Sequence, residues 1–163
     1  MKINIMIGIP AIGKSTYSSD RKGFRISSDD YIEQHAALHG KTYNDVFKDY
    51  AGEADRKAKD LFRRIVDANE LDEIWIDRTN MRAKARSYWI NYAKKKGNEF
   101  YAYDFKAPAT EQEKFAYFER LNGRPGKTIP LFVITGMLDT YEAPTLEEGF
   151  KEIFEVPFSI VQT

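Results

Sequence analysis

An eight-residue segment near the start of the chain constrains the fold more than any other feature. Residues 8–15 read Gly-Ile-Pro-Ala-Ile-Gly-Lys-Ser and fit the pattern G-x-x-x-x-G-K-[ST] at every specified position. An apolar run over residues 2–7 precedes the segment and indicates a buried strand, and residues 14–21 can follow as a helix. The alternative is a plain strand-to-helix turn that happens to carry Gly and Lys. Because motif and setting agree, the sequence favours a phosphate-binding loop.

This loop predicts a nucleotide and a metal as cofactors. Lys14 is expected to reach the β and γ oxygens of ATP, and Ser15 to offer its hydroxyl to Mg²⁺. The residues expected to contact the nucleotide are Gly8, Ile9, Pro10, Ala11, Ile12, Gly13, Lys14, Ser15 and Thr16.

Apolar runs alternate with amphipathic segments along the chain, which is the pattern of an α/β domain with a mostly parallel sheet. We expect strands over residues 2–7, 24–27, 73–76, 99–105 and 153–161, with helices between them. The longest of these helices is expected over residues 43–69, where apolar residues recur three or four apart, and we interpret it as scaffold. The predicted fold is that of the P-loop kinases: five parallel strands, in the order 2-3-1-4-5 that is usual for such kinases, with helices on both faces. A chain of 163 residues predicts a single domain, 1–163, with a small lid at about 120–129.

Composition excludes several classes of function. The 25 basic and 25 acidic side chains cancel, which argues against a protein that coats nucleic acid through overall charge. Cysteine is absent, so disulfides and thiolate nucleophiles are excluded. We find no leader peptide and no apolar run of membrane length, so a cytoplasmic protein with no membrane partner is expected.

Two aspartates follow expected strands at the edge where open α/β sheets bind ligands. Asp29 comes shortly after the strand at 24–27, and Asp77 directly follows the strand at 73–76. In such folds, an acidic residue at the position of Asp77 lies near Mg²⁺. Two alternatives stay open: Ser28 or Asp29 can cap the next helix, and many strands end in Asp for turn geometry.

Residues 78–96 contain no acidic side chain and carry a series of basic ones. With the interleaved aromatic residues, they could steer and stack a polyanion at the rim of the site, with Arg78, Arg82 and Arg86 as candidates. The lysine run 94–96 also fits a helix C-terminus, where cations complement the helix dipole. The aromatic residues can equally belong to the core.

The segment from Arg120 to Lys127 contains two Gly and one Pro and follows an expected helix that begins near Thr110. Flexible arginines at a helix end suit a lid that closes over a nucleotide and neutralises charge on the transferring phosphoryl group. An exposed loop with solubilising charges is the alternative. The lid is favoured because the phosphate loop supplies a ligand on which it can close.

With these residues in view, the chain resembles the kinase module of the polynucleotide 5′-hydroxyl kinases, which include phage enzymes and the animal polynucleotide kinase/3′-phosphatase. The resemblance covers nearly the whole length. It is carried by the phosphate loop GIPAIGKST, by Ser28-Asp29-Asp30-Tyr31, by Ile76-Asp77-Arg78-Thr79-Asn80, by the R-x-N-x-R of Arg120, Asn122 and Arg124, and by the closing segment EAPTLEEGFKEIFEVPF from Glu142.

The resemblance implies a role for each matching residue. Lys14 and Ser15 would hold triphosphate and Mg²⁺, and Asp29 would be the general base that accepts the proton of a 5′-hydroxyl. Arg124 would contact the transferring phosphate and Arg120 would lie near the adenine. Asp77 would help to position the metal or the acceptor.

The chain also departs from the family. Relatives often carry Arg just before the base, where this chain has Ser28, so we expect Arg78 or Arg82 to contact the acceptor phosphate instead. Ala11 stands where many relatives have Gly, a small change if that position needs no positive φ. The DxDGT phosphatase motif is absent, so no 3′-phosphatase activity is expected.

The leading hypothesis is an ATP-dependent polynucleotide 5′-hydroxyl kinase that acts on DNA or RNA ends, with a separate phosphatase and ligase as partners. Two alternatives remain: a kinase of a small-molecule hydroxyl, such as a nucleoside, sugar or antibiotic, and a nucleotide-binding switch that phosphorylates nothing.

Overall fold

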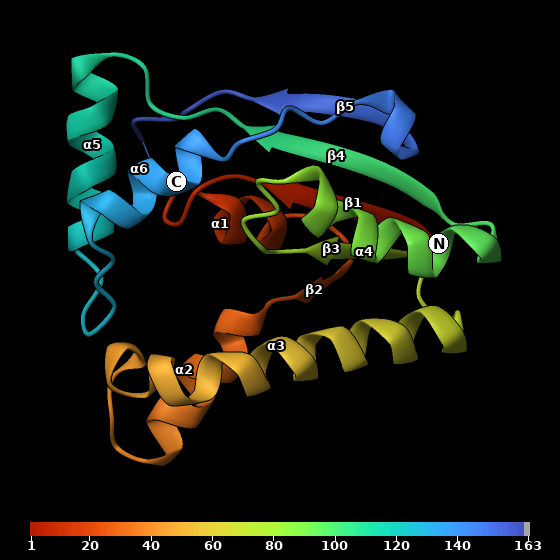
Figure 1. Cartoon of the computed structure of the whole chain (residues 1–163), viewed down its shortest axis with the longest axis horizontal. Helices are drawn as coiled ribbons and strands as arrows, with labels where there is room; N and C mark the ends of the chain where they lie inside the picture. The colour runs from red at the N-terminus through yellow and green to blue at the C-terminus, as the bar shows by residue number, and fades with distance from the viewer. Residues whose placement is uncertain (162–163) are drawn as a thin grey trace.

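Five parallel strands form one sheet in the computed structural model, which describes residues 1–161 (Figure 1). The strands are β1 (Lys2–Ile7), β2 (Phe24–Ile26), β3 (Glu73–Ile76), β4 (Glu99–Phe105) and β5 (Phe150–Val156). Their order, β2-β3-β1-β4-β5, confirms the predicted topology. Because every pair is parallel, all carboxyl ends lie along one edge, on the left in Figure 1.

Helices connect the strands by crossovers. They are α1 (Lys14–Ser19), α2 (Ser28–Leu38), α3 (Tyr43–Ala68), α4 (Ala83–Ala93), α5 (Glu111–Asn122) and α6 (Leu131–Asp139), with single 3₁₀ turns at Lys94–Lys96 and Leu146–Glu148. Because the strand order reverses after β2, right-handed crossovers place α1 on one face of the sheet and α3 and α4 on the other, while α5 and α6 lie beyond the carboxyl ends of the strands (Figure 1).

Aromatic packing follows this division of the two faces. Tyr17 of α1 packs against Trp75 and Phe105, with ring centroids 6.0 and 5.2 Å apart respectively. Phe62 of α3 packs edge-on against Trp89 of α4 at 5.0 Å. Side chains of β1, β3 and β4 therefore alternate between two covered layers, whereas the edge strands β2 and β5 are partly exposed.

Helix ends are set by their capping residues. Thr42 and Asp45 form a reciprocal capping box at the start of α3, and Asn69 ends that helix in the left-handed conformation. At α5, Thr110 accepts from the Glu113 N–H at 3.1 Å, but the Glu113 carboxylate accepts from the Ala109 N–H rather than from Thr110. Only one of the two reciprocal bonds of a capping box therefore forms at this helix start.

The last strand differs from its prediction at both ends. The structure has Phe150–Val156, whereas the apolar run predicted 153–161. Pro157 has no N–H and ends the ladder, and Phe150 pairs with Phe100 across a register shift that an apolar run does not reveal.

Arg86 was wrongly grouped with the basic residues of the rim. Its side chain is fully buried, and its guanidinium donates to both carboxylate oxygens of Glu148 at 2.8 Å and to the Asn80 carbonyl at 2.9 Å. Because the ion pair joins α4 to the segment before β5, Arg86 holds the fold together and does not reach the surface.

Removing the Arg86 side chain should therefore destabilise the protein strongly. Arg86→Ala leaves Glu148 and the Asn80 carbonyl without their partner, and the free energy of unfolding should fall by about 3–5 kcal/mol. Urea unfolding followed by circular dichroism measures this change. Arg82→Ala is the matched control, because Arg82 is largely exposed and the same truncation should change stability by less than about 0.5 kcal/mol. Equal losses in the two variants would contradict the assignment.

Candidate nucleotide-binding site

The phosphate loop lies between β1 and α1 and wraps around the Lys14 side chain. Lys14 Nζ donates to the carbonyls of Gly8 and Ile9 at 2.8 and 2.9 Å. Gly13 has a φ of 108°, which favours glycine, and Ala11 has a φ of 61°. Position 11 therefore does need a positive φ, so the change from the glycine of many relatives is not a small one and costs about 1 kcal/mol.

Burial changes the charge state of Lys14. The ammonium is almost inaccessible to solvent, and this loss of hydration lowers its pKa to about 8, against the opposing influence of Asp77 and Asp29. Among the described residues, Lys14 Nζ donates hydrogen bonds only to neutral carbonyl groups, so a phosphate bound in the loop would provide the negatively charged partner that stabilises the buried ammonium.

Asp77 lies at the end of β3, next to the loop. The Ser15 hydroxyl donates to Asp77 Oδ2 at 2.6 Å, as expected for the pair that approaches Mg²⁺ in such folds. Arg25 of β2 also donates to Asp77 Oδ2, at 2.9 Å, and to both oxygens of Asp30. The Ser15 hydroxyl and the Asp77 carboxylate are hard oxygen donors that fit Mg²⁺, with Arg25 as the partner that orients Asp77.

Asp29 lies in the first turn of α2, and both of its carboxylate oxygens accept hydrogen bonds. The Tyr43 hydroxyl donates to Oδ1 at 2.8 Å and Lys127 Nζ donates to Oδ2 at 3.0 Å. Burial opposes ionisation of Asp29, but Lys127, Tyr43 and Lys14 outweigh it and hold the pKa of this carboxyl below its ordinary value. Asp29 is therefore an ionised carboxylate that accepts hydrogen bonds, and its negative charge favours the charged form of Lys14.

The lid arginines differ in their surroundings. Arg124 has two guanidinium nitrogens, Nε and Nη2, that are shielded from solvent and have no hydrogen-bond partner among the described residues. Its charge acts on the pKa of Lys14. Arg120 lies over the Phe158 ring, 4.8 Å from the centroid, and donates to the Ser159 carbonyl beyond β5. Arg124 thus has unused donors beside the phosphate loop.

Arg78 and Arg82, the expected contacts to an acceptor phosphate, both have acidic partners. Arg78 pairs with Asp55 of α3, and Arg82 lies 3.6 Å from a carboxylate oxygen of Glu142. Segments distant in sequence therefore supply the acids that residues 78–96 lack.

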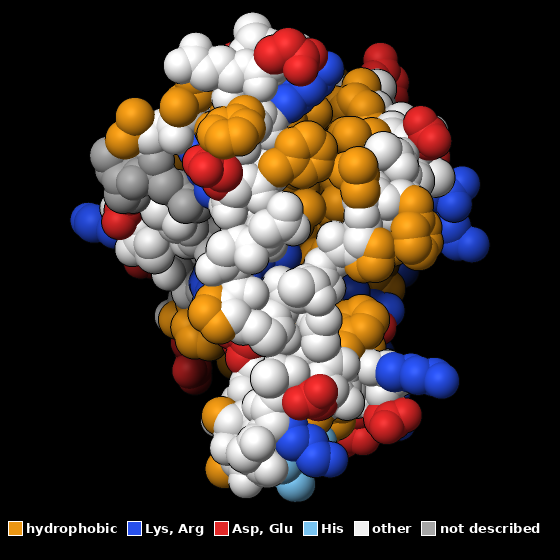
Figure 2. Space-filling view, turned by 90° about the vertical axis from the view of Figure 1, so that its left-hand side faces the viewer, with side chains coloured by type: hydrophobic (Ala, Val, Ile, Leu, Met, Phe, Trp, Pro, Cys, Tyr) orange, Lys and Arg blue, Asp and Glu red, His pale blue; other side chains and the backbone are white. Residues whose placement is uncertain are grey.

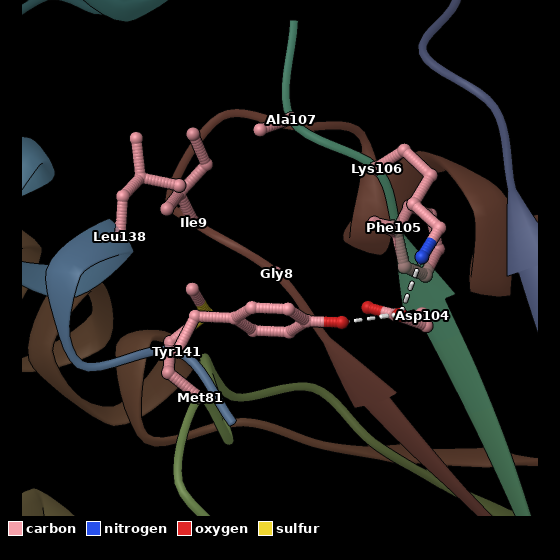
Figure 3. A pocket seen from close by; sticks show the side chains of 9 residues that line it. All are labelled: Gly8, Ile9, Met81, Asp104, Phe105, Lys106, Ala107, Leu138 and Tyr141. Atoms are coloured by element: carbon pink, nitrogen blue, oxygen red, sulfur yellow. Dashed lines mark hydrogen bonds and ion pairs between the residues drawn. The ribbon is translucent and has the colours of Figure 1, made fainter. Parts of the chain in front are cut away.

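A small cavity of about 80 Å³ opens beside the start of the phosphate loop (Figure 3). Its walls are mainly apolar, and Tyr141 and Lys106 point toward Asp104. The Tyr141 hydroxyl and Lys106 Nζ donate to Asp104 Oδ2 at 2.6 and 2.9 Å. A group that enters this cavity from the phosphate loop would meet a buried carboxylate.

Sequence reasoning missed four residues of the site. Arg25, Tyr43 and Lys127 bond the two aspartates, and Asn44 bonds Gly126 and Thr128 of the lid. Tyr43 and Asn44 were assigned to a scaffold helix, and Lys127 was counted only as part of the lid. Only Arg25 had a local signal in the sequence, because it lies in the expected strand just before Asp29 and so close to the predicted site. The other three contact partners from distant segments, so no spacing in the sequence indicates them.

The chain belongs to the AAA_33 family, whose model, described as an AAA domain, matches residues 3–144. The structure resembles that of a Chloroflexus aurantiacus protein classed as a kinase, with a TM-score of 0.66 and 14% identity over 96% of this chain and 87% of that one.

Two further solved structures share the fold. Kti12 of Chaetomium thermophilum, in complex with ADP-AlF3, has a TM-score of 0.59 and 15% identity over 95% of this chain and 88% of that one. A fungal RNA kinase has a TM-score of 0.57 and 15% identity over 99% of this chain and 77% of that one. At these identities the likeness shows the P-loop kinase fold, and the family implies nucleotide binding.

Within residues 1–161, no helix has the length and apolarity needed to cross a membrane.

The lowered pKa of Lys14 predicts that ATP binding takes up a proton in alkaline solution. At pH 9 most of the free protein carries neutral Lys14, because its pKa is about 8, whereas bound phosphate favours the ammonium. Calorimetric titrations with ATP in two buffers of different ionisation enthalpy should show uptake approaching one proton. The dissociation constant should rise by a factor approaching ten per pH unit above pH 8. In Lys14→Arg the uptake should vanish, and its persistence there would refute the assignment to Lys14.

Proposed function

We propose that this protein is an ATP-dependent polynucleotide 5′-hydroxyl kinase that transfers the γ-phosphate to DNA or RNA ends. The transfer chemistry rests on one observation, the grouping of a carboxylate with two cations. Asp29 accepts hydrogen bonds at both oxygens, and its negative charge interacts with the buried ammonium of Lys14. The charge of Arg124 also acts on Lys14, and two of its guanidinium nitrogens have no hydrogen-bond partner among the described residues. Phosphoryl transfer requires positioning and neutralisation of charge more than covalent chemistry. This arrangement provides a carboxylate for the acceptor and two cations for the phosphates.

Each residue has a distinct part in the proposed reaction. Lys14 and the N–H groups of the loop would bind the phosphates, and Arg124 would neutralise charge on the transferring group. Asp29 would orient the hydroxyl and accept its proton as the new bond forms. Ser15 and Asp77 would hold Mg²⁺, which neutralises phosphate charge when it is bound.

The rim supports an acceptor with bases. Apolar side chains gather on the face at the carboxyl ends of the strands (Figure 2). On this side, α5 and α6 carry exposed Phe115, Leu131, Phe132 and Leu138. Exposed aromatic side chains near a phosphate site can stack unpaired bases of any sequence. The closing segment from Glu142, which resembles the animal polynucleotide kinase, gives independent support for this acceptor. A separate phosphatase and ligase would then prepare and use the ends.

An acceptor panel tests this proposal. The protein is incubated with γ-labelled ATP, Mg²⁺ and 5′-hydroxyl or 5′-phosphorylated oligonucleotides of DNA and RNA. Label should reach only the 5′-hydroxyl strands, and absence of transfer to all of them would overturn the proposal. Asp29→Asn keeps the shape of the side chain and should lower kcat by about 10²–10⁴-fold, with ATP affinity nearly unchanged. Loss of ATP binding in that variant would contradict the base assignment.

One observation favours a second function, phosphorylation of a small-molecule hydroxyl. Arg78 and Arg82 are both paired with acids, so the rim is less cationic than the sequence indicated. A nucleoside or sugar needs no cations for a phosphate backbone, and the cavity at Asp104 could accept a polar group of such an acceptor. Nucleosides and sugars in the same panel distinguish the two functions, because oligonucleotides would then compete without being labelled.

A further inference from the structure

The lid rests on the turn between α2 and α3, below α5 and α6 in Figure 1. The Asn44 N–H donates to the Gly126 carbonyl at 3.0 Å. The Asn44 side chain donates to Thr128 Oγ1 at 2.5 Å and accepts from the Thr128 N–H at 3.0 Å. These bonds join residues more than 80 positions apart, so the lid is docked on the start of α3, next to Tyr43, whose hydroxyl donates to Asp29.

Arg124 and Lys127 occupy the two ends of one tight turn. The Lys127 N–H donates to the Arg124 carbonyl at 3.2 Å. Pro125 is the second residue, and Gly126, with a φ of 66°, is the third, which is the sequence signature of a type II turn. A Cβ at position 126 would lie 2.7 Å from Thr42 Cβ, so only glycine fits here. The two cations therefore approach the site as one unit.

Lys127 is largely buried between two acids. Its ammonium lies 3.0 Å from Asp29 Oδ2, 3.1 Å from Glu33 Oε1 and 4.3 Å from the centroid of the Tyr43 ring. Burial of an ammonium is costly, and these partners offset that cost. Without Lys127, Asp29 would keep the Tyr43 bond on Oδ1 and lose the one on Oδ2.

We propose that Lys127 is a positioning residue that holds Asp29 in place when the lid is closed, so that lid closure sets the donor and acceptor sides together. Arg124 approaches the phosphates, and Lys127, three residues further along the same turn, fixes the carboxylate that orients the acceptor hydroxyl. The inference rests on the proposed transfer reaction.

Kinetics of Lys127→Gln test the proposal. With a 5′-hydroxyl acceptor to which the panel shows label transfer, kcat should fall about tenfold or more, with KM for ATP within about threefold of the wild type. Lys127→Arg keeps the charge and should restore most of the rate. Lys41→Gln is the matched control, because it makes the same change at an exposed lysine of the neighbouring turn and should leave kcat unchanged.

The pH dependence separates positioning of Asp29 from simple anchoring of the loop. Asp29 faces Lys127 of the lid, Tyr43 of α3 and Lys14 of the phosphate loop. Lys127 favours the ionised carboxylate, so its removal should raise the pKa of Asp29. The acidic limb of kcat/KM should then move to higher pH in Lys127→Gln and stay in place in Lys41→Gln. An unshifted limb together with wild-type kcat would overturn the proposal while leaving the proposed function intact.

A titration that needs no substrate makes the two failures distinguishable. The ¹³C resonance of the Asp29 carboxyl, assigned with Asp29→Asn, reports its pKa in the wild type and in Lys127→Gln. A higher pKa in the variant supports the contact even if no acceptor is phosphorylated, in which case the proposed function alone fails. Equal pKa values in the two proteins would show that Lys127 does not hold Asp29.

Discussion

Parallel pairing of β1 with β3 on one side and β4 on the other is the constraint on which the site depends. It brings the phosphate loop after β1 next to the segment after β3. The Gly8 N–H donates to the Thr79 carbonyl at 2.9 Å, and the Asp77 N–H donates to the Ile26 carbonyl at 2.9 Å. These backbone bonds hold the ends of three strands in register. Ser15 can reach Asp77 only because this register is kept.

Charge balance is the second organising principle of the site. Lys14 is bound to loop carbonyls, Arg25 to Asp77 and Asp30, and Lys127 to Asp29 and Glu33. Buried charges without partners are costly, so each such contact both stabilises the side chain and fixes its position. Arg124 is different, because two of its shielded nitrogens have no partner in the described part of the chain. These nitrogens are free to donate hydrogen bonds to a bound anion, which agrees with the influence of Arg124 on Lys14 in the phosphate loop.

Local sequence signals predicted most of the architecture. The strand, loop and helix of the phosphate loop, the long helix α3 and the acids after β2 and β3 all follow from short patterns with a direct backbone meaning. Errors arose where a distant segment decides the outcome. The bounds of β5 depend on pairing with β4, and Arg86 was taken for a surface residue because its partner, Glu148, lies 62 positions away. Ala11 shows a different limit. Its positive φ of 61° could not be predicted, because alanine, unlike glycine, does not indicate a left-handed conformation.

The sequence by itself determined that residues 8–15 form a phosphate loop, that the sheet is parallel and that Asp29 and Asp77 share its rim. These features depend on the periodicity of apolar residues and on motifs that constrain their own backbone. Only the tertiary structure decided that Arg25 orients Asp77, that Arg78 and Arg82 are paired with acids, and that the lid docks on Asn44. It also placed Lys127 on Asp29 across 98 positions of the chain. Contacts of that kind leave no spacing in the sequence, because they depend on how separate helices and loops come to rest against one another.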